Sequence, residues 1–361
     1  MLHVLSADGW GGTEVQVAEQ LRRREMSQCH QALAVLDSHG ELHHQLRYEG
    51  VEVHALEGGR NFSKAIWRLA RLIRIRPWDL VEAYGFRASV AVRLAQALTL
   101  SRPTIVMGVR NVHMVETEEV TNLKSRLVLA VERRLSWTVT CYDANSRGAV
   151  EFLVKSGFPS EKFRVIPNGV SLPEGLEAAT RHEQPTIVSV ARFVSRKRHE
   201  HLIRAVAVLR DRGHNVRCVL IGTGPTLESC RRFARELGVD EHVEMLGELS
   251  QPNTLQAVAA ADVFALCSLW EGLPGSVLEA MALGLPVVAT KVSGTSEVVV
   301  DEATGFLVPV DDIEALAGAL ARVLSDAALR QRMGEAAKTR ATQYSFERVV
   351  QAKDALYREL A

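Results

Sequence analysis

Short runs of Val, Ile and Leu alternate along the chain with longer stretches in which apolar residues recur at helical spacing. Such short runs, bounded by turn residues, are typical of strands that are buried on both faces of a parallel sheet. The alternation therefore predicts repeated strand–helix units. In the first half, the predicted strands are Leu2–Leu5, Ala32–Leu36, Val51–Ala55, Leu80–Ala83, Thr104–Met107, Thr138–Cys141 and Arg164–Ile166.

A second series of strands follows a break in the pattern. Residues 168–185 lose apolar periodicity and contain prolines and glycines, which indicates an exposed linker. We therefore predict one domain over residues 1–172 and another over residues 173–344. The closing helix, 345–361, has no strand after it and is free to pack on either domain; we expect it to join the first. The second series is Thr186–Val190, Val216–Ile221, Val243–Met245, Val263–Leu266, Val287–Thr290 and Gly305–Val308.

Composition excludes several classes of protein. The 361 residues hold 43 Lys and Arg against 43 Asp and Glu, so a general nucleic-acid binder, which would carry a basic excess, is not expected. The 5 cysteines are scattered without zinc-site or disulfide spacing. No basic segment precedes the short N-terminal apolar run, so a cytoplasmic location is expected.

The first loop with candidate chemistry follows the strand Leu2–Leu5, because ligands of open parallel sheets bind beyond the carboxyl ends of the strands. Gly11 and Gly12 leave room for a ligand to approach the backbone. Thr13 and Gln16 have the spacing of a capping box, which would aim the first helical amides at an anion. A tight strand-to-helix turn explains the glycines equally well.

Two further loops carry charge or glycine where strands end. Arg192 and Lys197 lie in a basic segment, and an arginine fork with a lysine point charge suits a diphosphate. A solvated basic turn fits the same residues. Gly222 and Gly224 resemble half of a dinucleotide fingerprint whose third glycine is missing. This favours a loop that lines a nucleotide or sugar pocket over an NAD site.

Two carboxylates mark the most informative stretch, residues 268–286. Glu271 falls in a loop rich in glycine and proline, and Glu279 is expected in the first turn of the following helix. Sugar hydroxyls donate charge-assisted hydrogen bonds to carboxylates, so the pair could flank one ligand. Ser276 and Glu279 also have capping-box spacing, which offers a purely structural explanation for Glu279.

This stretch resembles the signature of the retaining glycosyltransferases of family 4, in which two glutamates are separated by seven residues. Other segments resemble further motifs of that family, in the same order along nearly the whole chain. They are Gly11–Gly12, Val165–Val170, Arg192 with Lys197, Ile221–Pro225, Leu246–Gly247, Gly294, Thr304–Val308 and Tyr344–Phe346.

The resemblance implies the α/β GT-B architecture. Two Rossmann-like, doubly wound parallel-sheet domains would face a central cleft, with the C-terminal helix crossing back to the first. A nucleotide-sugar donor would bind mainly to the second domain and an acceptor mainly to the first.

The same resemblance assigns roles to single residues. Arg192 and Lys197 would neutralise the donor diphosphate as it leaves, so no metal or other cofactor is expected. Glu271 would lie beside the donor sugar, and Glu279 would bind the ribose. The remaining donor contacts would come from Gly11, Gly12, Gly222, Gly224, Leu246, Gly247, Leu273, Pro274, Gly275 and Ser276.

One position near the donor sugar stays open. Family members often have a histidine just after the strand that corresponds to Thr104–Met107. Here Arg110 stands close to that place and His113 lies three residues beyond it. Either side chain could also serve a structural purpose.

The expected reaction moves a hexosyl unit from a UDP- or GDP-sugar to a small-molecule, glycan or lipid-linked hydroxyl, with retention of configuration. The rival functions are a sugar-nucleotide epimerase or hydrolase and a catalytically idle binding subunit. The segment Arg60–Arg76 is basic and amphipathic. It either contacts an anionic membrane or buries its apolar stripe on the sheet and leaves its charges in water.

Overall fold

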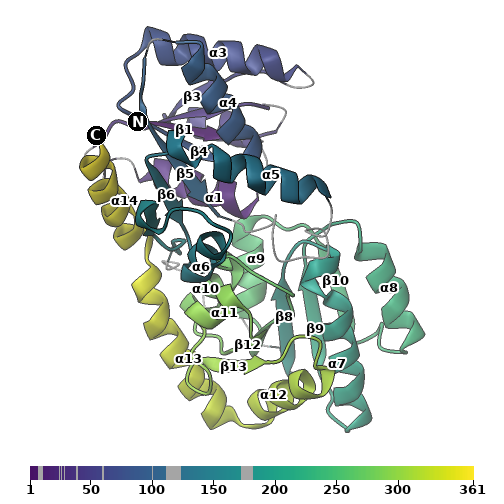
Figure 1. Cartoon of the computed structure of the whole chain (residues 1–361). Helices are drawn as coiled ribbons and strands as arrows, with labels where there is room; N and C mark the ends of the chain where they lie inside the picture. The colour runs from purple at the N-terminus through teal and green to yellow at the C-terminus, as the bar shows by residue number, and fades with distance from the viewer. Residues whose placement is uncertain are drawn as a thin grey trace. The chain divides into compact units, whose positions relative to one another are not determined.

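Parallel sheets form the centre of both halves of the chain (Figure 1). The computed structural model describes residues 1–361 except 7–10, 24, 26, 28, 38–39, 59–60, 100, 111–122 and 172–181. The chain divides into two units. Unit 1 comprises Met1–Gly169 and Phe346–Ala361, and unit 2 comprises Val170–Ser345.

Unit 1 contains a seven-stranded sheet in the order β3-β2-β1-β4-β5-β6-β7. The order changes direction between β1 and β4, which is the switch point where sheets of this kind bind ligands. The strands are β1 (Leu2–Leu5), β2 (Ala32–Val35), β3 (Glu52–Ala55), β4 (Leu80–Tyr84), β5 (Thr104–Val109), β6 (Cys141–Ala144) and β7 (Phe163–Val165). The helices are α1 (Gly12–Arg22), α2 (Leu42–Tyr48), α3 (Phe62–Ile75), α4 (Phe86–Ala97), α5 (Leu123–Arg134), α6 (Arg147–Lys155) and α14 (Phe346–Leu360).

Unit 2 contains a six-stranded sheet in the order β10-β9-β8-β11-β12-β13, with its switch point between β8 and β11. The strands are β8 (Thr186–Val190), β9 (Arg217–Ile221), β10 (Val243–Gly247), β11 (Val263–Leu266), β12 (Val287–Thr290) and β13 (Gly305–Val308). The helices are α7 (His199–Asp211), α8 (Leu227–Glu236), α9 (Gln251–Ala259), α10 (Gly275–Ala282), α11 (Ser293–Val298), α12 (Ile313–Ser325) and α13 (Ala327–Ala341).

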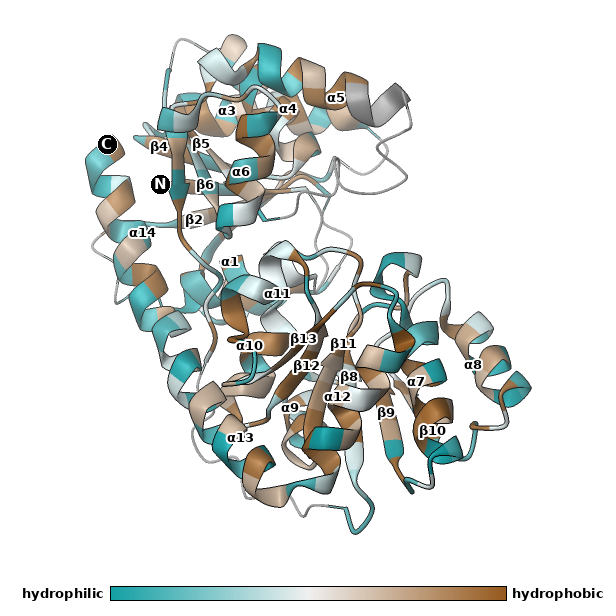
Figure 2. Ribbon diagram, turned by 60° about the horizontal axis from the view of Figure 1, so that its bottom comes forward, coloured by the Kyte–Doolittle hydropathy of each residue, from teal (hydrophilic) through white to brown (hydrophobic). Residues whose placement is uncertain are grey.

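Helices cover both faces of each sheet. In unit 2, one core packs the sheet against α7, α8 and α12, and a second packs it against α9, α10 and α13. In unit 1, α3, α4 and α6 share one core, whereas α1 and α2 share another. The strands of unit 2 are accordingly mostly brown, hence apolar, in Figure 2. The prediction of two doubly wound parallel sheets is confirmed.

One predicted strand is misplaced. The sequence places a strand at Thr138–Cys141, but β6 begins only at Cys141. Thr138 instead ends a short 3-10 helix, and its Oγ1 donates a hydrogen bond to the Leu135 carbonyl at 2.7 Å. The strand continues through Asp143, which hydropathy would place in solvent but which is fully buried.

The predicted capping box at the start of α1 is also wrong. The helix begins at Gly12 with Gly11 as its N-cap, so Thr13 is already helical. The Gln16 side chain turns elsewhere: its Nε2 donates to the Gly169 carbonyl at 2.8 Å, and its Oε1 accepts from the Gly169 amide at 2.7 Å. These two hydrogen bonds attach Gly169, the last residue of the first segment of unit 1, to helix α1.

The chain passes from one unit to the other twice, at Gly169–Val170 and at Ser345–Phe346. Val170 donates its amide to the Tyr344 carbonyl at 2.8 Å, so the two passages are joined within unit 2. In unit 1, a Cβ at Gly169 would lie 2.4 Å from the Phe346 ring, which explains the glycine at this position. From Phe346 onward α14 packs on unit 1.

Candidate active site

The loop between β8 and α7 presents a cation at the carboxyl edge of the unit 2 sheet. Phe193 is fully buried, and its ring stacks on His199 at 4.0 Å between centroids. Arg192, next to this anchor, is exposed. Among the described residues, no hydrogen bond or ion pair engages the Arg192 guanidinium. The buried Phe193 thus fixes the backbone of this loop, and the charge of Arg192 stays available to a ligand.

Two glycines allow the loop between β9 and α8 to pack closely against this first loop. A Cβ on Gly222 would lie 2.2 Å from the Ala191 carbonyl oxygen, and one on Gly224 would lie 2.3 Å from that of Phe193. Their φ angles, 133° and 152°, also favour glycine. The Phe193 amide donates to the Thr223 carbonyl at 2.8 Å. Both glycines therefore have a packing role, whatever else they contact.

The end of β10 adjoins the same group of loops. The Gly222 amide donates to the Gly247 carbonyl at 2.7 Å, and Gly247 has a φ of 74°. Leu246, just before it, is 38% exposed at the end of this edge strand. Leu246 and Gly247 are therefore available to border a ligand at this edge.

Glu271 lies in the loop after β11 and is 8% exposed. It accepts a hydrogen bond from Ser268 Oγ at 2.5 Å and pairs directly with Lys197 Nζ. Burial is the main influence that lowers the pKa of Lys197; Arg196 and Arg192 lower it further, and Glu271 opposes them. The Leu269 amide also donates to the Arg196 carbonyl at 2.8 Å, so the two loops are joined along their backbones.

Helix α10 starts beside this pair, and its start differs from the prediction. The helix runs over Gly275–Ala282 with Pro274 as N-cap, and no side chain caps it. The predicted capping box from Ser276 to Glu279 is therefore wrong, and Glu279 lies in the second turn, partly exposed. Buried Leu273 and Pro274 lead into the helix. The first amides of α10 are thus free of side-chain caps and suit an anion or hydroxyl.

The unit 2 sheet therefore brings most of the predicted site residues to one edge. The residues that follow β8, β9, β10 and β11 meet there because the carboxyl ends of parallel strands share one edge. Gly11, Gly12 and Arg110 belong to unit 1. His113 lies outside the described residues, so its role stays a prediction.

Arg110 follows β5 in unit 1, and its side chain points into the interior. The guanidinium forms an ion pair with Asp143 through Nη2 and donates from Nη1 to the Ile166 carbonyl at 3.3 Å. The Arg110 side chain is 8% exposed. Its charge is thus already balanced inside unit 1.

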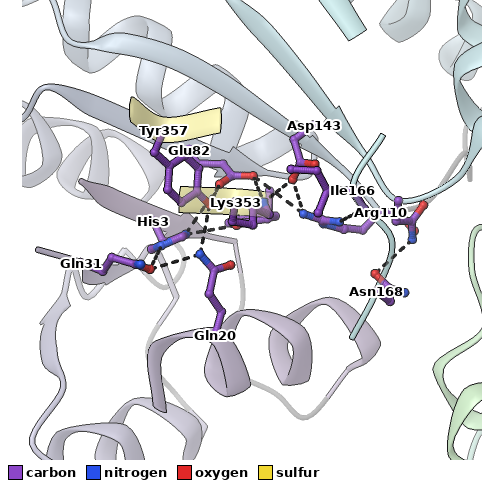
Figure 3. A network of polar contacts seen from close by, with 12 residues as sticks. His3, Gln20, Gln31, Glu82, Arg110, Asp143, Ile166, Asn168, Lys353 and Tyr357 are labelled. Atoms are coloured by element: carbon purple, nitrogen blue, oxygen red, sulfur yellow. Dashed lines mark hydrogen bonds and ion pairs between the residues drawn. The ribbon is translucent and has the colours of Figure 1, made fainter. Parts of the chain in front are cut away.

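Arg110 belongs to a buried polar network that also includes α14 (Figure 3). Lys353 pairs with Asp143 and with Glu82 Oε1, the latter at 2.8 Å. Tyr357 donates its hydroxyl to Glu82 Oε2 at 2.7 Å. Burial alone would raise the pKa of Glu82, but Lys353 and Arg110 hold it at about 2. Two carboxylates and two cations thus balance one another inside the unit.

His3 extends this network to β1. Its Nε2 contacts Gln31 Oε1 at 2.9 Å and its Nδ1 contacts the Tyr84 hydroxyl at 3.1 Å. Burial, aided by the nearby cations, lowers the pKa of His3 to about 3, so the ring is neutral. Sequence analysis missed this network. The available signal was the presence of Glu82 and Asp143 within apolar runs.

A cavity of about 370 Å³ opens at the carboxyl ends of β1, β4, β5 and β6 in unit 1. Thr13, Glu14 and Ser6 contribute polar groups to its lining. Tyr142 also lines it; this residue is 3% exposed, and its hydroxyl has no hydrogen-bond partner among the described residues. Its apolar lining comes from Leu5, Phe86, Met107, Val109, Leu129, Leu153 and Phe158.

Comparison with known families identifies the chain. Residues 11–169 match the glycosyl transferase 4-like domain, and residues 177–340 match the glycosyl transferases group 1 family. This chain belongs to the family 4 glycosyltransferases. The two matched ranges correspond to the two sheets described above.

Curated relatives of this glycosyltransferase resemble parts of it. The GDP-mannose-dependent alpha-(1-6)-phosphatidylinositol monomannoside mannosyltransferase of Mycolicibacterium smegmatis is 37% identical over 163 residues, 43% of each chain. The lipopolysaccharide core biosynthesis glycosyltransferase LpsE of Rhizobium meliloti is 33% identical over 227 residues, which cover 61% of this chain and 65% of LpsE. The matches thus span less than two thirds of either relative.

Solved structures show that the glycosyltransferase has the GT-B fold, as predicted. HepE of Anabaena, in complex with UDP-glucose, superposes with a TM-score of 0.84 over 100% of this chain and 99% of HepE, at 19% identity. Sucrose-phosphate synthase of Thermosynechococcus elongatus superposes with a TM-score of 0.84 over 99% of this chain and 98% of its own, at 20% identity.

The described part of the glycosyltransferase lacks two features. None of its helices there has the length and apolar character needed to span a bilayer. No group of three or more His, Cys, Asp or Glu side chains in the same residues is placed to hold a metal ion.

Proposed function

We propose that this protein transfers a glycosyl unit from a UDP- or GDP-sugar to an acceptor hydroxyl, with retention of configuration. The observation that carries the proposal is the nearly buried Lys197–Glu271 pair in the loops that also carry exposed Arg192, at the carboxyl edge of the unit 2 sheet. The relatives support a nucleotide sugar as donor: HepE was solved with UDP-glucose, and the Mycolicibacterium mannosyltransferase is GDP-mannose-dependent.

In the proposed reaction the donor diphosphate binds between Arg192 and Lys197. Negative charge grows on the diphosphate as the bond to the sugar breaks, and fixed cations stabilise that charge most when they need not reorganise. Glu271 holds Lys197 in place and accepts a hydrogen bond from Ser268. The uncapped amides of α10 would add a positive potential at the same edge. These groups would make a metal ion unnecessary.

The sugar and the ribose would contact the carboxylates. Glu271 has a second carboxylate oxygen besides the one that Lys197 and Ser268 engage, and this oxygen would accept a hydroxyl of the donor sugar. Glu279, on the second turn of α10, would accept the ribose hydroxyls. Leu246 and Gly247 would border the base.

The acceptor would enter the cavity of unit 1. Its apolar walls suit the body of an acceptor molecule, and Glu14, Thr13 and Tyr142 could bind hydroxyl groups. A small molecule, a glycan and a lipid-linked acceptor all offer such groups. We propose that the acceptor hydroxyl, rather than water, receives the sugar.

A measurement of nucleoside diphosphate release tests this function. UDP, GDP and ADP and their sugars are first screened by thermal shift, because a ligand that binds only the folded state raises the melting temperature. Release is then followed with and without candidate acceptors, and the product anomer is read by NMR. We expect release that depends on acceptor and persists in EDTA, with retained configuration. Equal release without acceptor would indicate a hydrolase. A changed donor sugar without net release would indicate an epimerase, and binding without any turnover would indicate an idle subunit.

A further inference from the structure

The cavity of unit 1 is large enough for a small molecule, and its walls are mainly apolar. Its volume of about 370 Å³ lies within the range of roughly 300–1,000 Å³ that is typical of small-molecule sites. Aromatic rings form much of the wall: those of Tyr84, Phe86, Tyr142 and Phe158. Aromatic pairs prefer edge-on or offset stacked contacts, which add to the gain from burying apolar area. The walls therefore suit a flat apolar body.

Tyr142 brings a buried hydroxyl group to this apolar wall. The residue is 3% exposed, and its hydroxyl has no hydrogen-bond partner among the described residues. Burial is the main influence that raises the pKa of Tyr142, so the group stays protonated and can donate a hydrogen bond. A buried hydroxyl without a partner costs stability, and a ligand oxygen inside the cavity would remove that cost.

Neighbouring aromatic rings hold Tyr142 in place. Its ring stacks on Phe163 with the centroids 5.0 Å apart and meets Phe158 edge-on at 5.7 Å. Phe158 and Phe163 are themselves buried in the core of unit 1. The hydroxyl is thus fixed before a ligand arrives, and such preorganisation lowers the entropic cost of binding.

The cation in the wall of the cavity is already paired. Arg110 is the one cation among the described residues that line the cavity, and Asp143 engages it. Glu132 accepts two hydrogen bonds from Arg93, both at 2.9 Å, and Glu14 has the same sign as an anionic ligand. A phosphate or carboxylate here would be a buried charge without a cation of its own, which is costly. The cavity therefore favours an uncharged ligand.

A free sugar fits the same walls poorly. A pyranose carries hydroxyls around its ring, and each needs a hydrogen-bond partner once water is excluded. The Ser6 hydroxyl already donates to the Tyr84 carbonyl at 3.3 Å and accepts from the Ala88 amide at 3.1 Å. Met107 and Leu153, both buried, add apolar surface. Most hydroxyls of a sugar would therefore lose water without gaining a partner.

We propose that the acceptor is an uncharged aromatic alcohol with oxygen atoms at both ends of an apolar body. The inference rests on the proposed function, because it names the acceptor of that reaction. Tyr142 lies inside β6, whereas Thr13 and Glu14 lie at the start of α1, beyond the carboxyl end of β1. One oxygen would accept from Tyr142, and the hydroxyl at the other end would lie at the carboxyl edge of the sheet. Transfer would replace the hydrogen of that hydroxyl with the glycosyl unit, and this hydrogen would leave as a proton with the nucleoside diphosphate.

Binding of four probes to the full chain tests the acceptor class without a need for turnover. The probe p,p′-biphenol has a hydroxyl at each end of an apolar body, and p-methylbiphenyl has a similar shape without oxygen. Methyl glucoside is a polar alcohol, and p-phenylphenyl phosphate adds charge. Thermal shift and calorimetry should rank p,p′-biphenol first and detect neither methyl glucoside nor the phosphate. No binding of p,p′-biphenol, or tighter binding of methyl glucoside or the phosphate, would overturn the proposal.

Tyr142→Phe separates the hydroxyl from the ring. It should weaken binding of p,p′-biphenol roughly two- to tenfold, the effect of one neutral hydrogen bond, and leave binding of p-methylbiphenyl unchanged. Without a probe, its melting temperature should equal or exceed that of the wild type, because a buried hydroxyl without a partner is removed. A lower melting temperature would show a structural partner for the hydroxyl and would count against the proposal. Tyr48→Phe, at a position 93% exposed on α2, is the matched control and should behave as wild type does.

Leu129→Trp places a larger side chain in the wall of the cavity. It should lower the affinity for p,p′-biphenol at least about tenfold, because the ligand and the indole would compete for the same space. Leu127→Trp is the control, since Leu127 belongs to the same helix, is 63% exposed and does not line the cavity. Wild-type affinity in Leu129→Trp would mean that p,p′-biphenol binds elsewhere, which would overturn the proposal.

Binding of nucleoside diphosphate keeps this proposal distinct from the proposed function. Lys197 and Glu271 belong to unit 2, so UDP or GDP should raise the melting temperature of Tyr142→Phe and Leu129→Trp as it does in the wild type. A wild type that binds the nucleotide but not p,p′-biphenol would overturn the acceptor class alone. A wild type that binds p,p′-biphenol but no nucleotide would overturn the proposed function.

Discussion

Lys197 Nζ and Glu271 Oε1 are in direct contact, although 74 positions separate the two residues in the sequence. The contact joins the loop after β8 to the loop after β11, the two strands at the switch point of the unit 2 sheet. Both side chains are nearly buried, with 11% and 8% exposed. Because each side chain balances the charge of the other, removal of either one leaves a nearly buried charge without its partner.

Lys197→Met should lower turnover roughly 100-fold or more, which is the scale of removing one preorganised charge from a site where charge develops. The substitution also leaves Glu271 without its cation, so binding of nucleoside diphosphate should weaken. Steady-state kinetics and nucleotide thermal shift measure the two effects. Lys338→Met, at an exposed position of α13, is the matched control and should keep wild-type rates.

Glu271→Gln keeps the size of the side chain and removes its charge. We expect turnover to fall at least about tenfold, because the loss of a charged hydrogen bond costs about 1.5–3 kcal/mol. The same cost in stability corresponds to a fall of about 3–12 °C in the melting temperature, so the protein should remain folded in the assay. The fall should appear in kcat if Glu271 acts on the sugar as the bond breaks. Near-wild-type kcat in both Glu271→Gln and Lys197→Met would contradict the site assignment.

Gly222→Ala and Gly224→Ala should each destabilise unit 2 and reduce nucleotide binding. The added Cβ would meet the backbone of Ala191 or Phe193, and the glycine φ angles are strained for alanine. We expect a loss of at least about 2 kcal/mol in urea unfolding. Gly318→Ala is the control: a Cβ there meets nothing within 4 Å in the middle of α12, so stability should hold or rise.

Acid should destabilise both units well before carboxylates protonate. Burial lowers the pKa of His3 to about 3 and that of His199 to about 4, from an ordinary value of 6.5. Since the unfolded chain takes up these protons first, stability is complete above about pH 6.5 and falls as the pH drops toward the folded values. Between about pH 7 and pH 5 each histidine should cost about 2 kcal/mol.

Urea unfolding at several pH values checks this slope. His199→Phe, which preserves the stack on Phe193, should remove the part of the pH dependence that belongs to unit 2. His44→Gln at an exposed position should leave the slope unchanged. If His199→Phe retains the full wild-type slope, His199 is not the buried neutral group described here.

Lys353→Met should destabilise unit 1 by about 3–5 kcal/mol, because it leaves Glu82 and Asp143 with one cation between them. The helix α14 should then become accessible to proteolysis at lower urea than in the wild type. Lys155→Met, at an exposed site of α6, removes the same charge without a buried partner and should have little effect. Equal stability of the two variants would mean that the network does not hold the helix.

Much of the fold was predictable because both sheets are buried on two faces. Strands such as Thr186–Val190 and Val263–Leu266 consist of apolar runs with sharp ends, and the structure has them at the predicted residues. The strand ending at Ala144 was misplaced because its charge, Asp143, is paired with a lysine more than 200 positions away. A hydropathy value describes one residue at a time and carries no information about a partner so far away in the sequence.

The candidate site was likewise predictable only in part. Arg192, Lys197 and Glu271 were identified from the sequence by residue type and by resemblance to the family. The contact between Lys197 and Glu271 was not predicted, since it depends on which strands are neighbours. The capping interpretation of Ser276 failed because Pro274 starts the helix earlier. Local spacing therefore identified the residues, and the sheet order determined their pairing.

The position of α14 matters for how the protein is made. Glu82 and Asp143 are synthesised long before Lys353 and Tyr357, which follow Asp143 by 210 positions or more. Until then the nascent first unit holds two buried carboxylates against the single charge of Arg110. Its folding should accordingly finish only after α14 has left the ribosome, so an expressed fragment that stops before Phe346 would be a substrate for chaperones and proteases.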